Sequence, residues 1–154
     1  GQEAYDLWVQ EGMSAPIGMD RAVIDFADEN CASPIPYGMA KTTTLNTVPD
    51  FQALGPASES AGTFDVQITG ATPNAYGILI ASDTTASVPF NGGKRLVSAP
   101  FMRITDFTTD ANGEITLTVP VPAGAAGSVM TYQPLFRDGM GFGIANAIYV
   151  EFCD

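Results

Sequence analysis

The chain contains no histidine, so the commonest general base and the commonest metal ligand of proteins are both missing. This absence excludes serine–histidine and cysteine–histidine catalysis, together with any ordinary zinc or copper site. No run of 18 apolar residues occurs either, so no transmembrane helix is expected. Enzyme classes that depend on an imidazole and proteins that insert into membranes are therefore set aside.

Charged residues are also scarce, at 15% of the chain, where about a quarter is usual. The surface must then consist largely of Thr, Ser, Asn, Gln, Gly and Ala, which favours a secreted β-protein over a cytosolic helical one. The few charges are unbalanced: 6 Lys and Arg against 17 Asp and Glu give a net charge of −11. Such a chain repels nucleic acid and anionic membranes, so neither is expected as a partner.

The length of 154 residues suits one domain with a modest core. The sequence starts GQEAYDLW, with no initiator Met and no basic-then-apolar leader. A mature chain whose signal peptide has been removed would begin in this way, and so would a shortened one. The expected location is extracellular or at the cell surface.

Only two cysteines are present, Cys31 and Cys153, and they lie 122 positions apart. Two cysteines cannot hold a structural zinc unaided. Two isolated buried thiols are one interpretation. The other is a disulfide, which is favoured because both residues stand at the expected edges of the folded unit. This bond would tie the start of the domain to its end and would require an oxidising compartment.

Period-two alternation dominates the sequence, whereas the 3.6-residue period of helices is weak throughout. Phe64, Val66 and Ile68 alternate with polar residues in GTFDVQITG, which predicts a half-buried strand. Gly-, Pro- and Asn-rich turns separate the apolar stretches at fairly even spacing. These features predict an all-β fold, an antiparallel β-sandwich of the immunoglobulin-like or jelly-roll-like kind. The other expected strands lie within 75–82, 93–107, 113–122, 128–138 and 147–153.

Two local predictions are specific enough to test. The continuous apolar run AYGILIAS (75–82) predicts a strand that is covered on both faces. The stretch TTDANGEITL predicts a β-hairpin, because Asn112-Gly113 is the strongest short hairpin signal and both residues tolerate positive φ.

Residues 1–30 have no clear place in the strand series, so the expected organisation is an extended N-terminal arm (1–30) followed by a sandwich domain (31–154). The arm's segments AYDLWVQ and RAVIDFA are apolar enough to require burial. They either fold back on their own sandwich or add a strand to an exposed sheet edge of the next subunit. The only basic doublet of the chain, Lys94-Arg95, is either solvated or a patch for an acidic neighbour. The expected subunit contacts are Tyr5, Leu7, Trp8, Val9, Val23, Ile24, Phe26, Lys94 and Arg95.

The order of motifs over residues 31–153 resembles a small β-sandwich module found in secreted and cell-surface proteins of environmental bacteria. The motifs that carry the resemblance are CASPIPYG, GTFDVQITG, AYGILIAS, VPFNGGKRLV, TTDANGEITLTVPVP, MTYQPLFRD and ANAIYV. The resemblance implies a secreted β-sandwich, and the family supplies no catalytic residues to carry over. The chain departs from the family in residues 1–30 and in having no large partner domain.

Asp106, Asp110, Asn112 and Glu114 in DFTTDANGE form the most metal-like cluster, because oxygen ligands at alternate positions on a glycine turn suit Ca²⁺. The competing interpretation is a turn in which Asp and Asn side chains bond to the backbone. The spacing does not fit the twelve-residue helix–loop–helix calcium loop. No cofactor is expected apart from this calcium.

These observations lead to one main functional hypothesis and two alternatives. The main one is a non-catalytic structural subunit of an extracellular homopolymer (a fibre, tube or surface layer) that assembles with itself through the arm and sheet edges. The first alternative is a secreted adhesin-like or carbohydrate-binding module that uses exposed aromatic residues such as Trp8, Tyr76 or Tyr132. The second is a hydrolase with paired carboxylates, and the prediction is that the protein is not an enzyme.

Overall fold

The computed structural model describes residues 31–154, and the predictions made for the arm lie outside this range. The described residues form eleven strands and no helix, so they contain no helix that could cross a membrane. The predicted all-β fold is confirmed. The strands are β2 (Ile35–Tyr37), β3 (Asp50–Ala53), β4 (Thr63–Thr69), β5 (Tyr76–Ser82), β6 (Thr85–Phe90), β7 (Gly93–Val97), β8 (Met102–Thr108), β9 (Ile115–Pro120), β10 (Val129–Asp138), β11 (Gly141–Ile144) and β12 (Ala147–Glu151).

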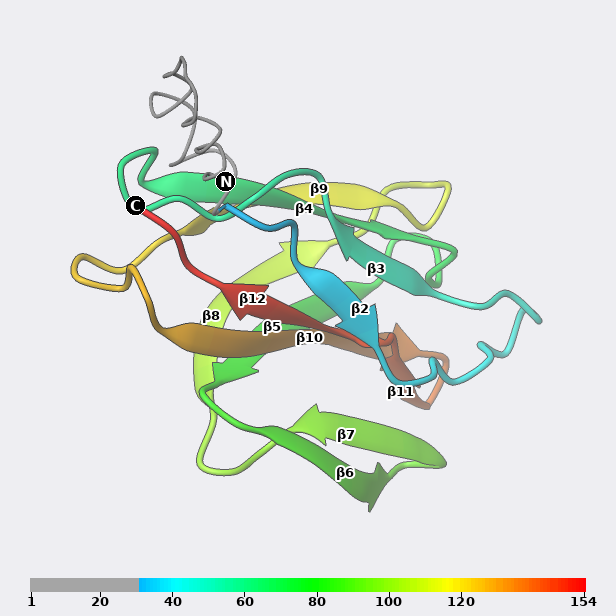
Figure 1. Ribbon diagram of the computed structural model, residues 1–154. Coiled ribbons are helices and arrows are strands. Elements are labelled where there is room, and N and C mark those ends of the chain that lie inside the picture. The colour runs from blue at the N-terminus through cyan, green and yellow to red at the C-terminus, as the bar shows by residue number, and fades with distance from the viewer. Residues whose placement is uncertain (1–30) are drawn as a thin grey trace, which may run out of the picture. The chain divides into compact units, whose positions relative to one another are not determined.

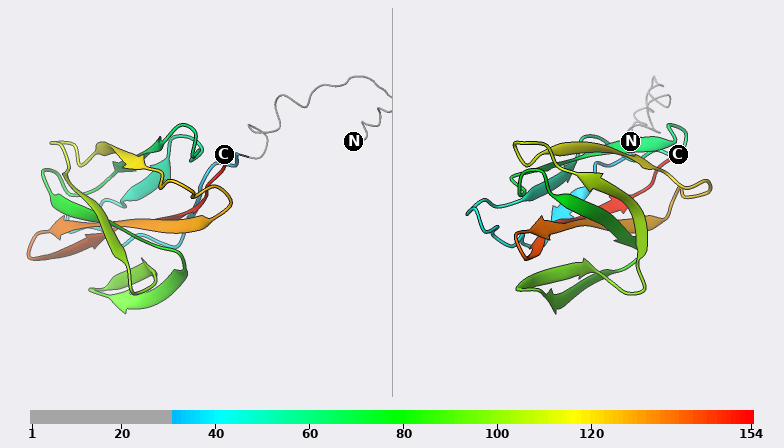
Figure 2. Two further views of the ribbon diagram at one scale, coloured as in Figure 1. Left: turned by 90° about the vertical axis from the view of Figure 1, so that its left-hand side faces the viewer. Right: turned by 180° about the vertical axis from the view of Figure 1, so that it is seen from behind.

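Two antiparallel sheets face each other and form the predicted sandwich (Figures 1 and 2). The larger sheet has the order β2-β12-β10-β5-β8, and β11 pairs with the far end of β10. The smaller sheet has the order β3-β4-β9. The hairpin β6-β7 forms a third layer on the outer face of the larger sheet (Figure 1).

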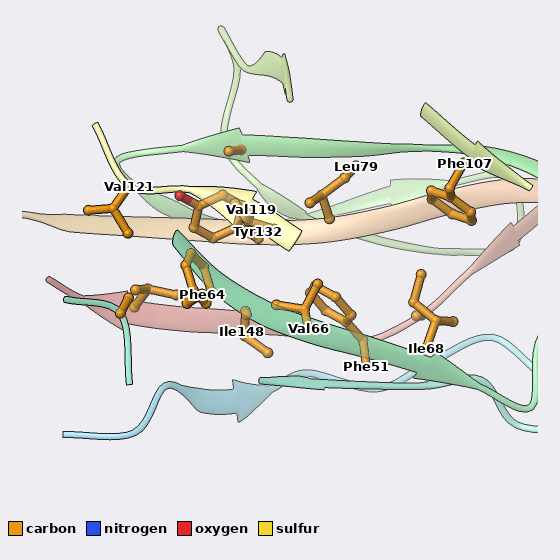
Figure 3. Packing of buried hydrophobic residues seen from close by; sticks show 14 of the residues in the cluster. Phe51, Phe64, Val66, Ile68, Leu79, Phe107, Val119, Val121, Tyr132 and Ile148 are labelled. Carbon is orange, nitrogen blue, oxygen red and sulfur yellow. The ribbon is translucent and has the colours of Figure 1, made fainter. Parts of the chain in front are cut away.

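Alternation along β4 builds the main core between the two sheets. Phe64, Val66 and Ile68 point inward and are buried, whereas the intervening polar residues face solvent or are half-buried. Phe51, Leu79, Tyr132 and Ile148 meet them from the other strands (Figure 3). Burial of each such side chain stabilises the fold by about 1.5–3 kcal/mol, so this cluster supplies the main driving force for folding.

The prediction for residues 75–82 is confirmed, because β5 is a central strand with both faces covered. Leu79 and Ala81 point into the main core. Ile80, together with Val97 of the hairpin, belongs to a second apolar cluster on the opposite face. A strand between two apolar layers has no polar side, which explains why AYGILIAS shows no alternation.

The predicted hairpin over residues 108–117 is wrong. β8 pairs with β5 in the larger sheet, whereas β9 pairs with β4 in the smaller one. Gly113 has the expected positive φ of 76°, but the turn carries the chain from one sheet to the other. In this turn the Gly113 carbonyl accepts a hydrogen bond from the Ala71 N–H at 3.1 Å. The two segments are so close that a Cβ atom on residue 113 would lie 2.0 Å from the Ala71 carbonyl oxygen. The turn is therefore held against a neighbouring loop.

The two cysteines are both disulfide-bonded, and the described residues hold no free cysteine. Since the chain has only these two, the predicted bond between Cys31 and Cys153 is confirmed. Cys153 also forms a parallel β-bridge with Ser58 and accepts the Glu59 N–H at 2.8 Å. The C-terminal end is thus fastened both to the loop after β3 and to the start of the described chain.

Asp138 at the end of β10 is a second fastening point, and it is only 3% exposed. Its carboxylate accepts hydrogen bonds from the Thr44 N–H at 2.9 Å, the Thr44 hydroxyl at 2.7 Å and the Thr72 hydroxyl at 2.8 Å. Burial raises the pKa of Asp138, but these hydrogen bonds and the charge of Lys41 outweigh it, so the pKa lies below its ordinary value. The carboxylate therefore holds two loops to the end of the larger sheet.

We expect Asp138→Asn to lower the free energy of unfolding by about 2 kcal/mol at pH 7, because hydrogen bonds to an ionised group are lost. A depressed folded-state pKa gives stability that is present above the unfolded-state pKa and disappears as the pH falls through the folded-state value. The difference between wild type and variant should therefore shrink in strong acid. Urea unfolding at a series of pH values measures it, with the exposed Asp50→Asn as control. A difference that grows on acidification would contradict this role.

Candidate binding groove

A groove of about 410 Å³ opens between the hairpin and the outer face of the larger sheet. We call it the aromatic–arginine groove. Its size lies within the range of ligand sites. It is lined by Tyr76, Gly77, Ile78, Phe90, Phe101, Arg103, Leu135, Phe136, Arg137 and Phe142.

Exposed aromatic side chains concentrate in this groove. Tyr76 is 45% exposed, Phe101 41% and Phe142 40%, and the described residues include no other exposed aromatic side chain. Phe90 faces Phe142 with ring centroids 5.9 Å apart. Exposed apolar groups that gather in one place mark interaction sites more often than scattered ones do.

The backbone places these rings for identifiable reasons. Phe90 ends β6 directly before Asn91-Gly92, where φ values of 47° and 82° form the tight turn that β6-β7 requires. Phe142 lies in β11, which pairs with the end of β10. Lys41 fixes these two segments to each other, because its Nζ donates to the Asn91 carbonyl at 2.6 Å and to the Phe142 carbonyl at 3.0 Å.

Positive charge gathers at the same place. The Arg95 guanidinium lies over the Phe101 ring, 5.4 Å from its centroid, and that of Arg137 lies over Phe142 at 5.9 Å. Arg103 lines the groove itself. The remaining two basic residues of the described chain are Lys41, at the hairpin turn, and Lys94 in β7. Of the five cations of residues 31–154, three are thus in or against the groove, and the other two lie on or against the hairpin, in a chain of net charge −11.

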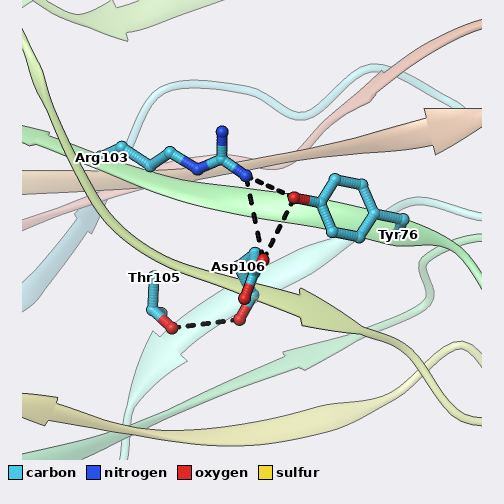
Figure 4. A network of polar contacts seen from close by, with 4 residues as sticks. All are labelled: Tyr76, Arg103, Thr105 and Asp106. Atoms are coloured by element: carbon cyan, nitrogen blue, oxygen red, sulfur yellow. Dashed lines mark hydrogen bonds and ion pairs between the residues drawn. The ribbon is translucent and has the colours of Figure 1, made fainter.

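Tyr76, Arg103 and Asp106 form a polar network at the edge of the groove (Figure 4). Arg103 donates to the Tyr76 hydroxyl, which in turn donates to Asp106 Oδ2 at 3.2 Å. Arg103 and Asp106 also form an ion pair at 3.9 Å, with both side chains more than half exposed. At such exposure the pair adds little stability, so its main consequence is to hold Tyr76 and Arg103 in place.

The residues predicted as calcium ligands do not form one site in the structure. Asp106 belongs to this network, whereas Asp110 bonds to its own turn, accepting the Asn112 N–H at 2.8 Å and the Glu114 N–H at 3.0 Å. Among the described residues no three acidic or cysteine side chains are grouped as a metal site requires. The turn interpretation thus accounts for Asp110, and calcium binding stays a prediction.

Of the aromatic residues proposed for binding, Tyr76 lies in the groove, whereas Trp8 is outside the described range. The prediction for Tyr132 is wrong, because this residue is 1% exposed in the main core, where burial raises its pKa to about 12. Of the basic doublet, Arg95 lies against Phe101, and Lys94 is exposed on β7.

Sequence reasoning missed five groove residues because the groove combines segments that are far apart in the chain. The missed residues are Phe90, Phe101, Arg103, Arg137 and Phe142. The scarcity of basic residues was the one usable signal, since all three arginines after residue 31 that the sequence contains line the groove or lie against one of its aromatic rings.

Comparison with known proteins gives no family. No protein-family model and no curated protein matches the chain. Among solved structures, that of T. fusca AA10A is similar, with 12% sequence identity and a TM-score of 0.38 over 59% of this chain and 48% of that one. The chain thus spans about half the length of that structure. The functional assignment therefore depends on the geometry of the groove.

Proposed function

We propose that residues 31–154 form a non-catalytic carbohydrate-binding module that works outside the cytosol and binds an acidic polysaccharide in the aromatic–arginine groove. One observation carries the proposal: all exposed aromatic side chains of the described chain lie in the groove together with Arg103 and Arg137, and Arg95 lies against Phe101 beside them. The flat faces of the rings suit the C–H faces of sugar rings, which they contact through dispersion and burial of apolar surface. The arginines suit carboxylates, which they bind through paired hydrogen bonds.

Two further observations support the location and the lack of catalysis. A disulfide between the first and last parts of the domain requires an oxidising compartment. The residues that line the groove include no carboxylate, whereas glycoside hydrolysis ordinarily uses two that flank the scissile bond. The resemblance to secreted bacterial modules agrees with this proposal.

We expect the protein to bind polygalacturonate and to lose this affinity when the carboxylates of the polymer are methyl-esterified. Phe101→Ala and Arg103→Gln should each weaken binding about tenfold, which corresponds to about 1.4 kcal/mol. Added salt should weaken it further, because exposed charges are screened. Titration calorimetry measures these affinities.

Leu54→Ala supplies the matched control. Leu54 is an exposed apolar residue directly after β3, and β3 belongs to the smaller sheet, which does not line the groove. Equal affinity for the esterified and the free polymer would overturn the acidic ligand. Undiminished binding by both groove variants would overturn the site.

A second candidate function is a structural subunit of an extracellular homopolymer. The observation that favours it is independent of the groove: the outer side of β9, at one edge of the smaller sheet, has neither a strand nor another hydrogen-bonding group beside it among residues 31–154. Unpaired edges are templates for strand addition by another chain.

A further inference from the structure

The strand orders of the two sheets end in four outer strands, β2, β8, β3 and β9, and three of these are protected. β2 is only three residues long and contains Pro36, which has no N–H. β8 is interrupted by a bulge at Ile104 and carries Arg103 and Asp106. At β3, the Phe51 N–H donates to Asn146 Oδ1 at 2.9 Å and the Phe51 carbonyl accepts from Asn146 Nδ2 at 2.8 Å. The side chain of Asn146 thus takes the place of a further strand.

β9 is the fourth edge, and the described residues leave it open. The Val121 N–H donates to Gly62, which continues the register in which Thr63 pairs with Pro120. Because bonded and non-bonded pairs alternate in antiparallel sheets, Val119, Leu117 and Ile115 bond to β4. The backbone groups of Thr116 and Thr118 then point outward, and no described residue bonds to them. The strand, ITLTVP, carries no charge.

The core side of this edge is incompletely covered. Ile115 and Leu117 of β9 point toward the main core but are only half-buried. A strand placed beside β9 would pair with the outward groups of Thr116 and Thr118. Its inward side chains would cover the half-buried apolar residues. The edge therefore offers both backbone hydrogen bonds and apolar surface to one added strand.

We propose that the segment AYDLWVQ (4–10) of a second copy of this chain adds to the free edge of β9. The inference depends on the second candidate function. Tyr5, Leu7 and Val9 alternate with Asp6, Trp8 and Gln10, so one face of an added strand is apolar and suits the half-buried core.

The length of chain between this segment and the sandwich allows it to reach a second molecule. Gln10 precedes Cys31, which the disulfide joins to Cys153, by 21 residues. This length reaches about 70 Å when extended, far more than the roughly 20 Å length of a six-residue strand. The segment can therefore reach a neighbouring molecule.

The contact is heterologous, since the arm of one copy occupies the edge of the next. Repeated without closure it generates a filament. Each copy then has one donor (residues 4–10) and one acceptor (β9), and these can be disabled separately.

Thr118→Pro tests the acceptor, because proline removes an outward N–H without removing a bond to β4. Thr118→Val is the matched control, since it keeps the N–H and changes only the side chain. We expect filaments in electron micrographs of the wild type and of Thr118→Val, and none of Thr118→Pro. Equal Tm values for the two variants exclude a folding defect.

Leu7→Asp tests the donor. The charged side chain would lie on the apolar face of the added strand, so this variant should also form no filaments, although its β9 is unchanged.

Mixing the two defective variants provides a second measurement. Leu7→Asp keeps its acceptor and Thr118→Pro keeps its donor, so the mixture should form a 1:1 dimer of about 32 kDa, twice the mass of a 16.1 kDa chain. Neither variant alone should exceed the mass of a monomer in native mass spectrometry. If wild type stays monomeric, the homopolymer function itself fails. If Thr118→Pro forms filaments, or if the mixture forms no dimers, then β9 is not the acceptor. The homopolymer function would not be overturned by either result.

Discussion

Replacement of Gln133 by leucine is expected to detach the hairpin and to lower the free energy of unfolding by about 3–5 kcal/mol. Gln133 lies in β10 and is fully buried. Its Oε1 accepts the Leu96 N–H at 2.9 Å, and its Nε2 donates to the carbonyls of Lys94 at 3.1 Å and Ala145 at 2.9 Å. Leucine has a similar volume, so the variant removes the hydrogen bonds while leaving the packing nearly unchanged. Three backbone groups, two of them in buried hydrogen bonds, then lose this partner.

The expected consequence extends to binding, because the hairpin supplies Phe90 to the lining of the aromatic–arginine groove and holds Arg95 over Phe101. Denaturant unfolding measures the stability change, and polygalacturonate titration measures the loss of affinity. Gln67→Leu is the control, since Gln67 lies on the solvent side of β4 and makes no side-chain hydrogen bond in the described structure. If Gln133→Leu is no more destabilising than Gln67→Leu, then Gln133 does not fasten the hairpin.

Sequence patterns predicted the parts of this fold that are determined locally. The alternation in β4 and the apolar run in β5 follow directly from which faces of each strand are covered. The positive φ at Gly113 was also predictable, because turn chemistry depends on a few adjacent residues.

Pairing between strands that are distant in the chain could not be predicted from local sequence. The segment around Asn112-Gly113 has the local chemistry of a hairpin, yet β8 and β9 belong to different sheets. Their partners, β5 and β4, are chosen by burial of apolar faces across the whole domain. No property of the turn itself encodes that choice.

The groove escaped prediction for a related reason. Phe90 and Phe142 are apolar residues that sequence reasoning assigns to a core as readily as to a surface. The exposure of Phe142 and the partial exposure of Phe90 result from where the hairpin ends on the sheet. Gln133 fixes that position through hydrogen bonds over 37 and 39 positions in the chain. Short strands such as β2 and β6 were missed as well, because three to six residues with proline and serine carry little periodicity.

Reduction of the disulfide is expected to lower the free energy of unfolding by about 4–5 kcal/mol. The bond closes a loop of more than a hundred residues, so its loss returns a large conformational entropy to the unfolded chain. The corresponding fall in Tm is about 15 °C for a domain of this size. Calorimetry of the oxidised protein and of a Cys31→Ser, Cys153→Ser double variant measures the fall, and non-reducing mass spectrometry verifies the bond. A fall of only a few degrees would show that other contacts already join the two ends.

The position of this bond also predicts what reduction leaves intact. The backbone N–H of Cys153 donates to Ala57 at 3.0 Å, and Cys153 keeps its bridge to Ser58, so the C-terminal end should stay docked in the reduced protein. Reduction then frees Cys31 from Cys153. Residues 1–30 would no longer start from a point that the disulfide holds. If segment 4–10 pairs with β9 of a second copy, reduction under conditions where the domain stays folded should lengthen the tether and loosen the filament without dissolving it. Polygalacturonate binding should be unchanged, because the groove lies on the hairpin face and neither cysteine is among the residues that line it. Separate responses of assembly and binding to one reductant would establish that the two surfaces are independent.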